Sequence, residues 1–227
     1  EATTASEGGP EYGSGHLVVK SSIRGFAATS HWKTCPALAG DEHDGENEPV
    51  STPILKWAGG KGRLVPLILS LAPLNFVTYH EPFMGAGAVF FGFCRANRIR
   101  SARLNDLNSD LIEMYRALRD NPQAVVRKLN DLAHEYLSRP HEQRAEVYYR
   151  VRSEKPSDPT DRAAWLIFLN RTCYNGLYRV NRRGGFNVPH GDYANPRIVN
   201  LEGLQAASLC LQETELSSVD FQVACEN

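Results

Sequence analysis

A glycine-rich turn and an acidic residue roughly twenty positions after it have the types and spacing to bind a nucleoside. The turn is the run from Glu81 to Gly87, Glu-Pro-Phe-Met-Gly-Ala-Gly, and such turns point free backbone N–H groups at a ligand. Apolar residues precede it and a helical pattern follows it, which predicts a strand, a tight turn and a helix. Residues 102–104 resemble a second strand that leads to Asp106. A carboxylate at this place can accept hydrogen bonds from both ribose hydroxyls.

Two other structures could produce the same turn. A dinucleotide fingerprint needs a third small residue so that the helix packs closely on the strand, but Phe90 occupies that position and would hold the two apart. A nicotinamide or flavin site, and with it a dehydrogenase, is therefore disfavoured. A glycine turn that only connects two elements stays open until other motifs are counted. Among nucleoside cofactors, the pattern points to S-adenosylmethionine.

The length of 227 residues allows one large core, or a core with a smaller appended domain. The apolar stretch from Val65 to Leu71 is too short to span a bilayer, and its spacing indicates an amphipathic helix that faces the core. We expect a soluble, intracellular protein without a membrane partner. The five cysteines are read as reduced thiols, with Cys94 and Cys173 buried in helices. No metal site and no disulfide framework are predicted.

Charge is unevenly distributed along the chain, although the formal net charge is only −1. Residues 1–50 hold eight acidic and three basic residues and are rich in small polar types, so we expect a flexible extension there. The remainder carries a net charge of +4, and residues 171–197 contain five arginines against Asp192 alone. Such a basic stripe suits nucleic acid, although a solvated surface would look the same.

Helical patterns dominate the segment after the second strand. From Ser109 onward they break at Asn121-Pro122 and near Pro140. A further helix should begin at Asp158-Pro159, with the aspartate as N-cap, and run to Arg171. Several helices after only two strands indicate an inserted helical domain, which we assign to residues 111–195.

The inserted domain should divide an incomplete α/β core into two parts, residues 51–110 and residues 196–227. In the second part, Leu201, Leu204 and Leu211 continue a helical pattern, and Glu215 to Ser217 should form a third strand that ends near Asp220.

A basic hairpin is predicted at the end of the inserted domain, over residues 177–189. Its expected strands, residues 177–180 and 186–188, flank the run Asn-Arg-Arg-Gly-Gly. A hairpin tip of this kind can enter the DNA major groove, where arginine recognises guanine and small apolar groups meet the thymine methyl. A surface hairpin whose arginines contact only phosphates or water is an equal alternative. The candidate base readers are Asn175, Leu177, Arg179 and Arg182.

The chain closely resembles the DNA adenine methylase (Dam) family in the order and spacing of four blocks over residues 53 to about 221. The blocks are Leu-Lys-Trp-Ala-Gly-Gly-Lys from Leu55, the turn from Glu81, Asn-Asp-Leu-Asn-Ser-Asp from Asn105, and Tyr-Asn-Gly-Leu-Tyr-Arg from Tyr174 with Phe-Asn-Val-Pro from Phe186. The resemblance implies a Rossmann-like, S-adenosylmethionine-dependent methyltransferase core with an inserted helical DNA-recognition domain. It also implies methyl transfer to the exocyclic amine of adenine in a short site of duplex DNA.

The resemblance implies roles for individual residues around the cofactor. Trp57 and Lys61 would contact S-adenosylmethionine, while Phe83, Gly85 and Gly87 would shape its turn and Asp106 would hold the ribose. Asp220, followed by Phe221, stands where the family contacts the adenine of the cofactor.

Other matching positions are implied to face DNA. Lys56 belongs to this set, and Asn175, Leu177, Arg179 and Pro189 match hairpin positions that lie against the target bases in family members that recognise GATC. GATC is therefore the expected site. An RNA methyltransferase is less expected, because the hairpin matches readers of duplex DNA. We expect a monomer in the prokaryotic cytoplasm, associated with the nucleoid.

The main departure from the family is a missing tetrapeptide of the type Asp-Pro-Pro-Tyr, since the sequence contains no Pro-Pro pair. The lone pair of the adenine amine is delocalised, and the tetrapeptide normally supplies acceptors for its hydrogens and an aromatic ring for the flipped base. No catalytic residue can therefore be assigned. The chain begins without Met and ends about where the next strand should start, so we expect the N-terminal portion of an Asp-Pro-Pro-Tyr-containing enzyme. Without the tetrapeptide, we expect little or no methylation activity on GATC duplex. A DNA-binding module that has lost catalysis is the alternative.

Overall fold

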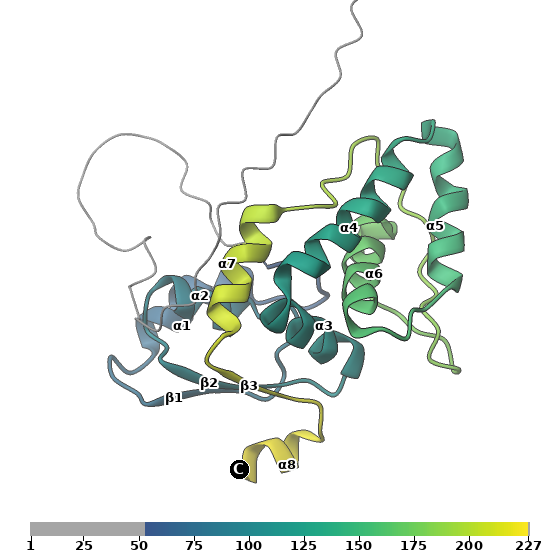
Figure 1. The fold of residues 1–227 in the computed structure, drawn as a ribbon. Coiled ribbons are helices and arrows are strands. Elements are labelled where there is room, and N and C mark those ends of the chain that lie inside the picture. Colours follow the sequence, from purple (N-terminus) through teal and green to yellow (C-terminus); the bar gives the residue numbers. More distant parts are fainter. Residues whose placement is uncertain (1–52, 227) are drawn as a thin grey trace, which may run out of the picture. The chain divides into compact units, whose positions relative to one another are not determined.

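The computed structural model describes residues 53–226, all of which belong to one compact unit (Figure 1). The expected flexible extension, residues 1–50, lies outside the described residues.

Three parallel strands form the sheet, in the order β1 (Thr78–Glu81), β2 (Ser101–Asn105) and β3 (Thr214–Ser217). Glu81 pairs with Leu104, which in turn pairs with Leu216. The three carboxyl ends therefore meet at one edge of the sheet, where parallel sheets commonly place their ligands. The expected second and third strands are confirmed. The first expected strand is also present, as β1, and it begins at Thr78. The preceding residue, Val77, lies outside the strand and is 84% exposed.

Local sequence signals explain where the helices begin. Asn108 caps α3 (Ser109–Asp120) by accepting a hydrogen bond from the N–H of Leu111, and Asn121 both ends α3 and caps α4 (Pro122–Leu137). Asp158 accepts from the N–H groups of Thr160 and Asp161 at the start of α6 (Pro159–Thr172). The predicted breaks and the predicted start of α6 are thus confirmed. The other helices are η1 (Gly62–Leu64), α1 (Val65–Leu71), α2 (Ala88–Arg95), η2 (His141–Gln143), α5 (Arg144–Ser153), η3 (Tyr174–Gly176), α7 (Leu201–Leu211) and α8 (Phe221–Glu226).

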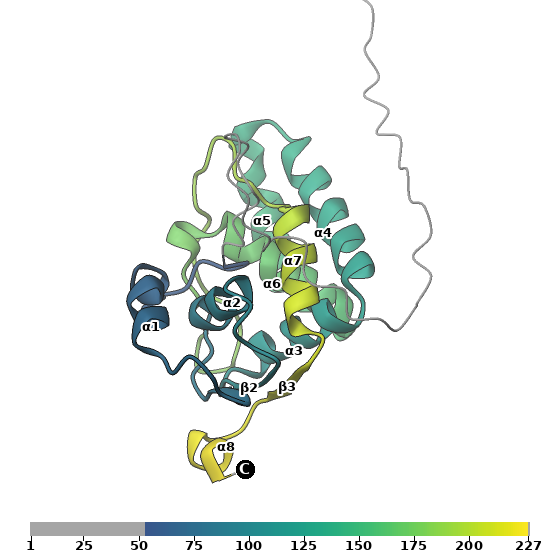
Figure 2. The same cartoon turned by 90° about the vertical axis from the view of Figure 1, so that its left-hand side faces the viewer.

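Helices α1, α2, α3 and α7 lie on one side of the sheet, and α8 lies on the other (Figures 1 and 2). The face toward α8 carries a cavity of about 600 Å³, with Arg103 and Glu215 in its wall. These two side chains form an ion pair of 3.1 Å on neighbouring strands.

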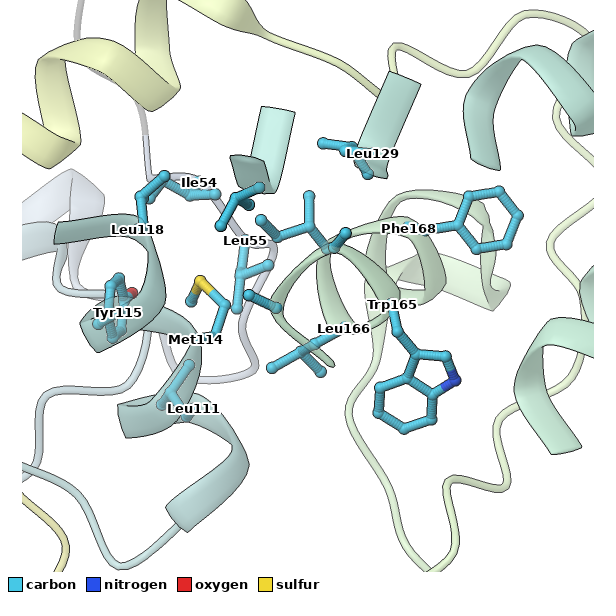
Figure 3. Close-up of a cluster of buried hydrophobic side chains, with 14 of the residues drawn as sticks. Ile54, Leu55, Leu111, Met114, Tyr115, Leu118, Leu129, Trp165, Leu166 and Phe168 are labelled. Carbon is cyan, nitrogen blue, oxygen red and sulfur yellow. The ribbon is translucent and has the colours of Figure 1, made fainter. Parts of the chain in front are cut away.

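One continuous hydrophobic cluster joins the sheet to the helices that follow it. Helix α6 runs through its centre, and eight consecutive residues of it, 163–170, are buried. A helix that is buried on all sides is expected to be apolar all round. Figure 3 shows α6 beside α3, with Ile54 and Leu55 packed between them. The division into a core and an inserted domain stays a prediction, since packing is continuous across it.

The expected hairpin is present as a chain reversal with little strand structure. A single β-bridge joins Val180 to Phe186, and a second joins Cys173 to His190. Backbone hydrogen bonds run from the N–H of Asn187 to the carbonyl of Arg179 and from the N–H of Asn181 to the carbonyl of Gly185. The carbonyl of Val188, farther along, accepts hydrogen bonds from the side chains of Tyr148 and Arg152 of α5. We call residues 173–193 the recognition loop.

The two cysteines expected inside helices differ from that expectation. Cys173 is buried, but it lies at the C-cap of α6 and not within the helix, whereas Cys94 lies in α2 and is only partly buried.

Candidate functional site

A cavity of about 170 Å³ opens at the carboxyl ends of β1 and β2. Its wall comes from the loop before η1, the turn after β1, the start of α2 and the residue after β2. We call it the nucleoside pocket. It is lined by Trp57, Ala58, Gly59, Gly60, Lys61, Glu81, Phe83, Met84, Gly85, Ala86, Ala88, Val89 and Asp106.

The glycine turn and the acidic residue after β2 are in direct contact in this pocket. The N–H of Gly85 donates to Oδ2 of Asp106 over 2.9 Å, and the N–H of Asn108 donates to Oδ1 over 3.0 Å. The carboxylate is thereby held in one orientation at the mouth of the turn. Each of its oxygens retains a further lone pair for a ligand hydroxyl. The sequence-based pairing of these two features is thus realised in the fold.

The two glycines of the turn have different surroundings. Gly85 has φ of +51°, and a Cβ there would lie 3.0 Å from Cδ1 of Trp57, within the pocket. Gly87 has φ of +66° and is the N-cap of α2. A Cβ on Gly87 would lie 2.9 Å from Cε2 of Phe91, which belongs to the core. Gly85 therefore borders the pocket, whereas Gly87 lets the turn pack closely on Phe91 of the core.

Glu81 is a pocket residue that the sequence interpretation did not select, although it stands in the quoted motif. Its carboxylate accepts a hydrogen bond of 3.0 Å from the hydroxyl of Tyr79. Burial raises the pKa of Glu81 to about 7, against the opposing effects of this hydrogen bond and of Lys61. The pocket thus holds one carboxylate that is partly protonated at neutral pH. Only the packing around β1 could have revealed that burial.

Hydrogen bonds connect the loop that contains Lys56 and Trp57 to the end of α6. Buried Asn170 accepts from the N–H of Lys56 and donates to its carbonyl, both over 2.8 Å, and also donates to the carbonyl of Gly176 over 2.9 Å. The Nζ atom of Lys56 lies 4.8 Å from the ring centroid of Tyr193. Trp57 lines the nucleoside pocket and stacks on Tyr178, with 5.2 Å between ring centroids.

The residues expected to face DNA are all exposed in the recognition loop or beside it, namely Lys56, Asn175, Leu177, Arg179, Arg182 and Pro189. Asn175 adopts φ of +54° in η3. Asn187 orients the guanidinium of Arg179, because Nε donates to its side-chain Oδ1 over 2.7 Å and a terminal nitrogen donates to its carbonyl over 3.0 Å. Contacts of these side chains with bases stay a prediction.

Asp220 does not line the nucleoside pocket. Its Oδ1 accepts from the N–H of Gln222 over 2.9 Å at the start of α8, which is a capping geometry. The following residue, Phe221, places its ring 5.4 Å from that of Phe83, which does line the pocket. The segment is therefore connected to the pocket through Phe221, and the contact assigned to Asp220 itself stays a prediction.

Within residues 53–226, no group of three or more His, Cys, Asp or Glu side chains could hold a metal ion. Among the helices of the same residues, none has the length and apolar character needed to cross a membrane.

Comparison with known proteins gives a consistent picture. A family model described as D12 class N6 adenine-specific DNA methyltransferase matches residues 57–227. Type II methyltransferase M.MjaIII of Methanocaldococcus jannaschii is 38% identical over 184 residues, which cover 77% of this chain and 64% of the relative. Type II methyltransferase M1.LlaDCHI of Lactococcus lactis subsp. cremoris is 38% identical over 181 residues, 76% of this chain and 60% of the relative.

DNA adenine methylase of Escherichia coli K12 is 42% identical over 150 residues, which cover 65% of this chain and 50% of the relative. The chain therefore spans from half to less than two thirds of the length of these three relatives.

Proposed function

Because the chain belongs to the D12 class of N6 adenine-specific DNA methyltransferases, we propose that it binds S-adenosylmethionine and duplex DNA for methylation of the exocyclic amine of adenine, at GATC. We assign no residue of this chain to the amine itself, because the sequence lacks an Asp-Pro-Pro-Tyr tetrapeptide. Three relatives are named as methyltransferases or as a DNA adenine methylase. The alternative of a DNA-binding module without catalysis gains no support from these names.

The single observation that carries the proposal is the hydrogen bond between Gly85 and Asp106. It brings the glycine turn and the acidic residue to one pocket, which is the arrangement that a nucleoside cofactor requires. In this pocket Asp106 binds the ribose hydroxyls, and the glycine turn leaves room that a side chain at residue 85 would occupy.

The chemistry of the remaining wall suits the two ends of S-adenosylmethionine. Lys61 offers an ammonium group to the carboxylate of the amino-acid end, while Trp57 and Phe83 offer aromatic faces. When bound, the cofactor supplies an electrophilic methyl group on a sulfonium ion. The chain contributes by orienting the cofactor, because correct placement of the reacting groups accounts for much of the rate of such a displacement.

Duplex DNA is proposed to lie on the recognition loop. The turn from Asn181 to Gly185 presents Arg182 and Arg183 to solvent, and Asn187 fixes the guanidinium of Arg179. An oriented guanidinium can donate two hydrogen bonds to guanine in the major groove. The target GATC, a monomeric state and a location at the prokaryotic nucleoid complete the proposal.

Calorimetry with S-adenosylhomocysteine tests the cofactor part. We expect the wild-type chain to bind, and Asp106→Ala to bind at least about tenfold more weakly, because each lost hydrogen bond to a charged group is worth roughly 1.5 kcal/mol or more. Asp106→Asn keeps one acceptor oxygen, which can accept from only one of the two backbone N–H groups, and it should fall between the two. Asp120→Ala, which removes an exposed carboxylate at the end of α3, serves as the control.

Two results would contradict the proposal. Equal affinity of wild type and Asp106→Ala would exclude Asp106 from the site. Wild-type protein that binds neither the cofactor product nor a GATC duplex would remove the proposed function for this chain.

A further inference from the structure

We propose that Tyr178 is a positioning residue that couples occupancy of the nucleoside pocket to DNA binding by the recognition loop. This inference rests on the proposed function. It assigns to Tyr178 no contact with either ligand, because its role is to hold two binding surfaces in one arrangement.

The first contact that supports this role is the ring stack with Trp57. The two ring centroids are 5.2 Å apart and the planes differ by 28°. Trp57 also lines the pocket, where its indole packs so closely on the glycine turn that a Cβ at Gly85 would lie 3.0 Å from it. A ligand in the pocket that orders Trp57 therefore also orders the surface on which Tyr178 rests.

The second contact runs through the hydroxyl group of Tyr178. It lies 3.3 Å from Oδ2 of Asp110 and 3.4 Å from Oδ1 of Asn108. Asn108 in turn donates its N–H to Asp106, the proposed ribose ligand. Burial, aided by the nearby Asp110 carboxylate, raises the pKa of Tyr178 to about 12. The hydroxyl is therefore protonated at neutral pH and can donate to these acceptors.

Within the recognition loop, to which Tyr178 itself belongs, the ring of Tyr178 also contacts Phe186. Phe186 meets Tyr178 edge-on with centroids 5.7 Å apart, and Trp165 of α6 meets Phe186 in the same manner at 6.0 Å. The neighbours of Tyr178 in sequence, Leu177 and Arg179, are exposed and belong to the proposed DNA surface. Displacement of the Tyr178 ring would therefore move the backbone that presents both.

Two separate sets of contacts connect the nucleoside pocket with Tyr178 in the recognition loop. One branch passes through the Trp57 ring and the other through Asn108 to Asp106, and both meet at Tyr178. A ligand that reduces the mobility of one surface lowers the cost of ordering the other, which is positive coupling. Coupling of this kind is reciprocal between the two ligands.

The experiment measures DNA affinity with and without S-adenosylhomocysteine. A fluorescein-labelled duplex that contains GATC is titrated with the 227-residue chain, and anisotropy gives the two dissociation constants. Their ratio is the coupling factor, which we expect to be about fivefold or more for wild type, within the range typical of linked sites. A general loss of DNA affinity changes both constants and leaves this ratio unchanged.

Two substitutions separate the branches. Tyr178→Leu removes both the stack and the hydroxyl, and it should bring the coupling factor to within about twofold of one. Tyr178→Phe keeps the stack and loses only the hydroxyl, so its coupling factor should be intermediate. Leu209→Ala, at an exposed residue of α7 that belongs to neither surface, is a control that should retain the wild-type factor.

The outcomes distinguish the inference from the function on which it rests. If wild type binds both ligands and Tyr178→Leu keeps the full coupling factor, the inference is wrong and the proposed function stands. Independent binding of the two ligands by wild type would also overturn it. If wild type binds neither ligand, the proposed function fails and the inference falls with it.

Discussion

At the scale of single residues, Glu81 should give the protein a measurable dependence of stability on pH. Its pKa is 4.5 in the absence of a fold and about 7 in the structure, because burial disfavours the charged form. The folded state therefore binds the proton more tightly, and the contribution of Glu81 to the free energy of unfolding declines as pH rises from about 4.5 to about 7.

Glu81→Gln isolates this effect, because glutamine imitates the protonated form and keeps an acceptor for Tyr79. Urea denaturation at several pH values should show a decline in wild type that is smaller in Glu81→Gln. The control is Glu142→Gln, at an exposed residue of η2. Parallel curves for wild type and Glu81→Gln would show that folding leaves the pKa of Glu81 unchanged.

Pocket residues differ in how far the sequence could identify them. Gly85 and Asp106 were predictable because a tight turn and a ribose ligand require particular residue types at a particular spacing. Trp57 and Lys61 depended on resemblance, and the fold then placed both in the same wall. The short motif at Asp220 contained no information about α8, whose start that side chain caps.

At the scale of elements, the turn between β1 and α2 should tolerate no side chain at Gly87. Gly87→Ala combines a left-handed backbone, which costs about 1–2 kcal/mol, with a clash against Phe91 and Met84 that adds about 1–3 kcal/mol. Gly184→Ala is a matched control, since Gly184 also has positive φ, of +77°, but has open space around its Cα.

Chemical denaturation should therefore show a larger loss of unfolding free energy for Gly87→Ala than for Gly184→Ala. Similar losses for both would mean that the steric term is absent and that α2 shifts freely. The comparison also tests the role of the second glycine of the turn. We expect Gly87 to be required for packing against α2 and not for contact with the pocket.

Helix boundaries were largely predictable from the sequence, whereas the detail of the recognition loop was not. Asn108, Asn121 and Asp158 act through local hydrogen bonds that a sequence reveals. The loop depends on contacts distant in sequence, such as those of Tyr148 and Arg152 with the carbonyl of Val188. The alternation of residue types alone would place the carbonyl of Val188 in a strand pair, whereas in the structure it accepts from these two side chains.

At the scale of the whole molecule, the order of elements was predictable and the packing between them was not. Two adjacent strands, β2 and β3, are separated by more than a hundred residues of mainly helical chain, as the pattern indicated. Periodicity could not show that α6 would pack on α3 in one cluster with the sheet. The helical segment therefore supports the pocket side of the molecule as well as the recognition loop.

The charge distribution of the molecule predicts how salt affects DNA binding. Residues after position 50 carry a net charge of +4, with arginines concentrated in residues 171–197. Each phosphate neutralised by such a group changes the slope of log affinity against log salt by about 0.9. Arg182 projects from the tip of the recognition loop, so Arg182→Gln should reduce the magnitude of that slope by about one contact.

Anisotropy titrations of a GATC duplex at several NaCl concentrations give the slope directly. Arg127→Gln, which removes an exposed arginine from α4, should leave the slope unchanged although it lowers the net charge equally. If both substitutions reduced the slope alike, the attraction would come from total charge and not from a located surface. A selective effect of Arg182→Gln places the phosphate backbone at the tip of the loop, beside the residues proposed to recognise bases.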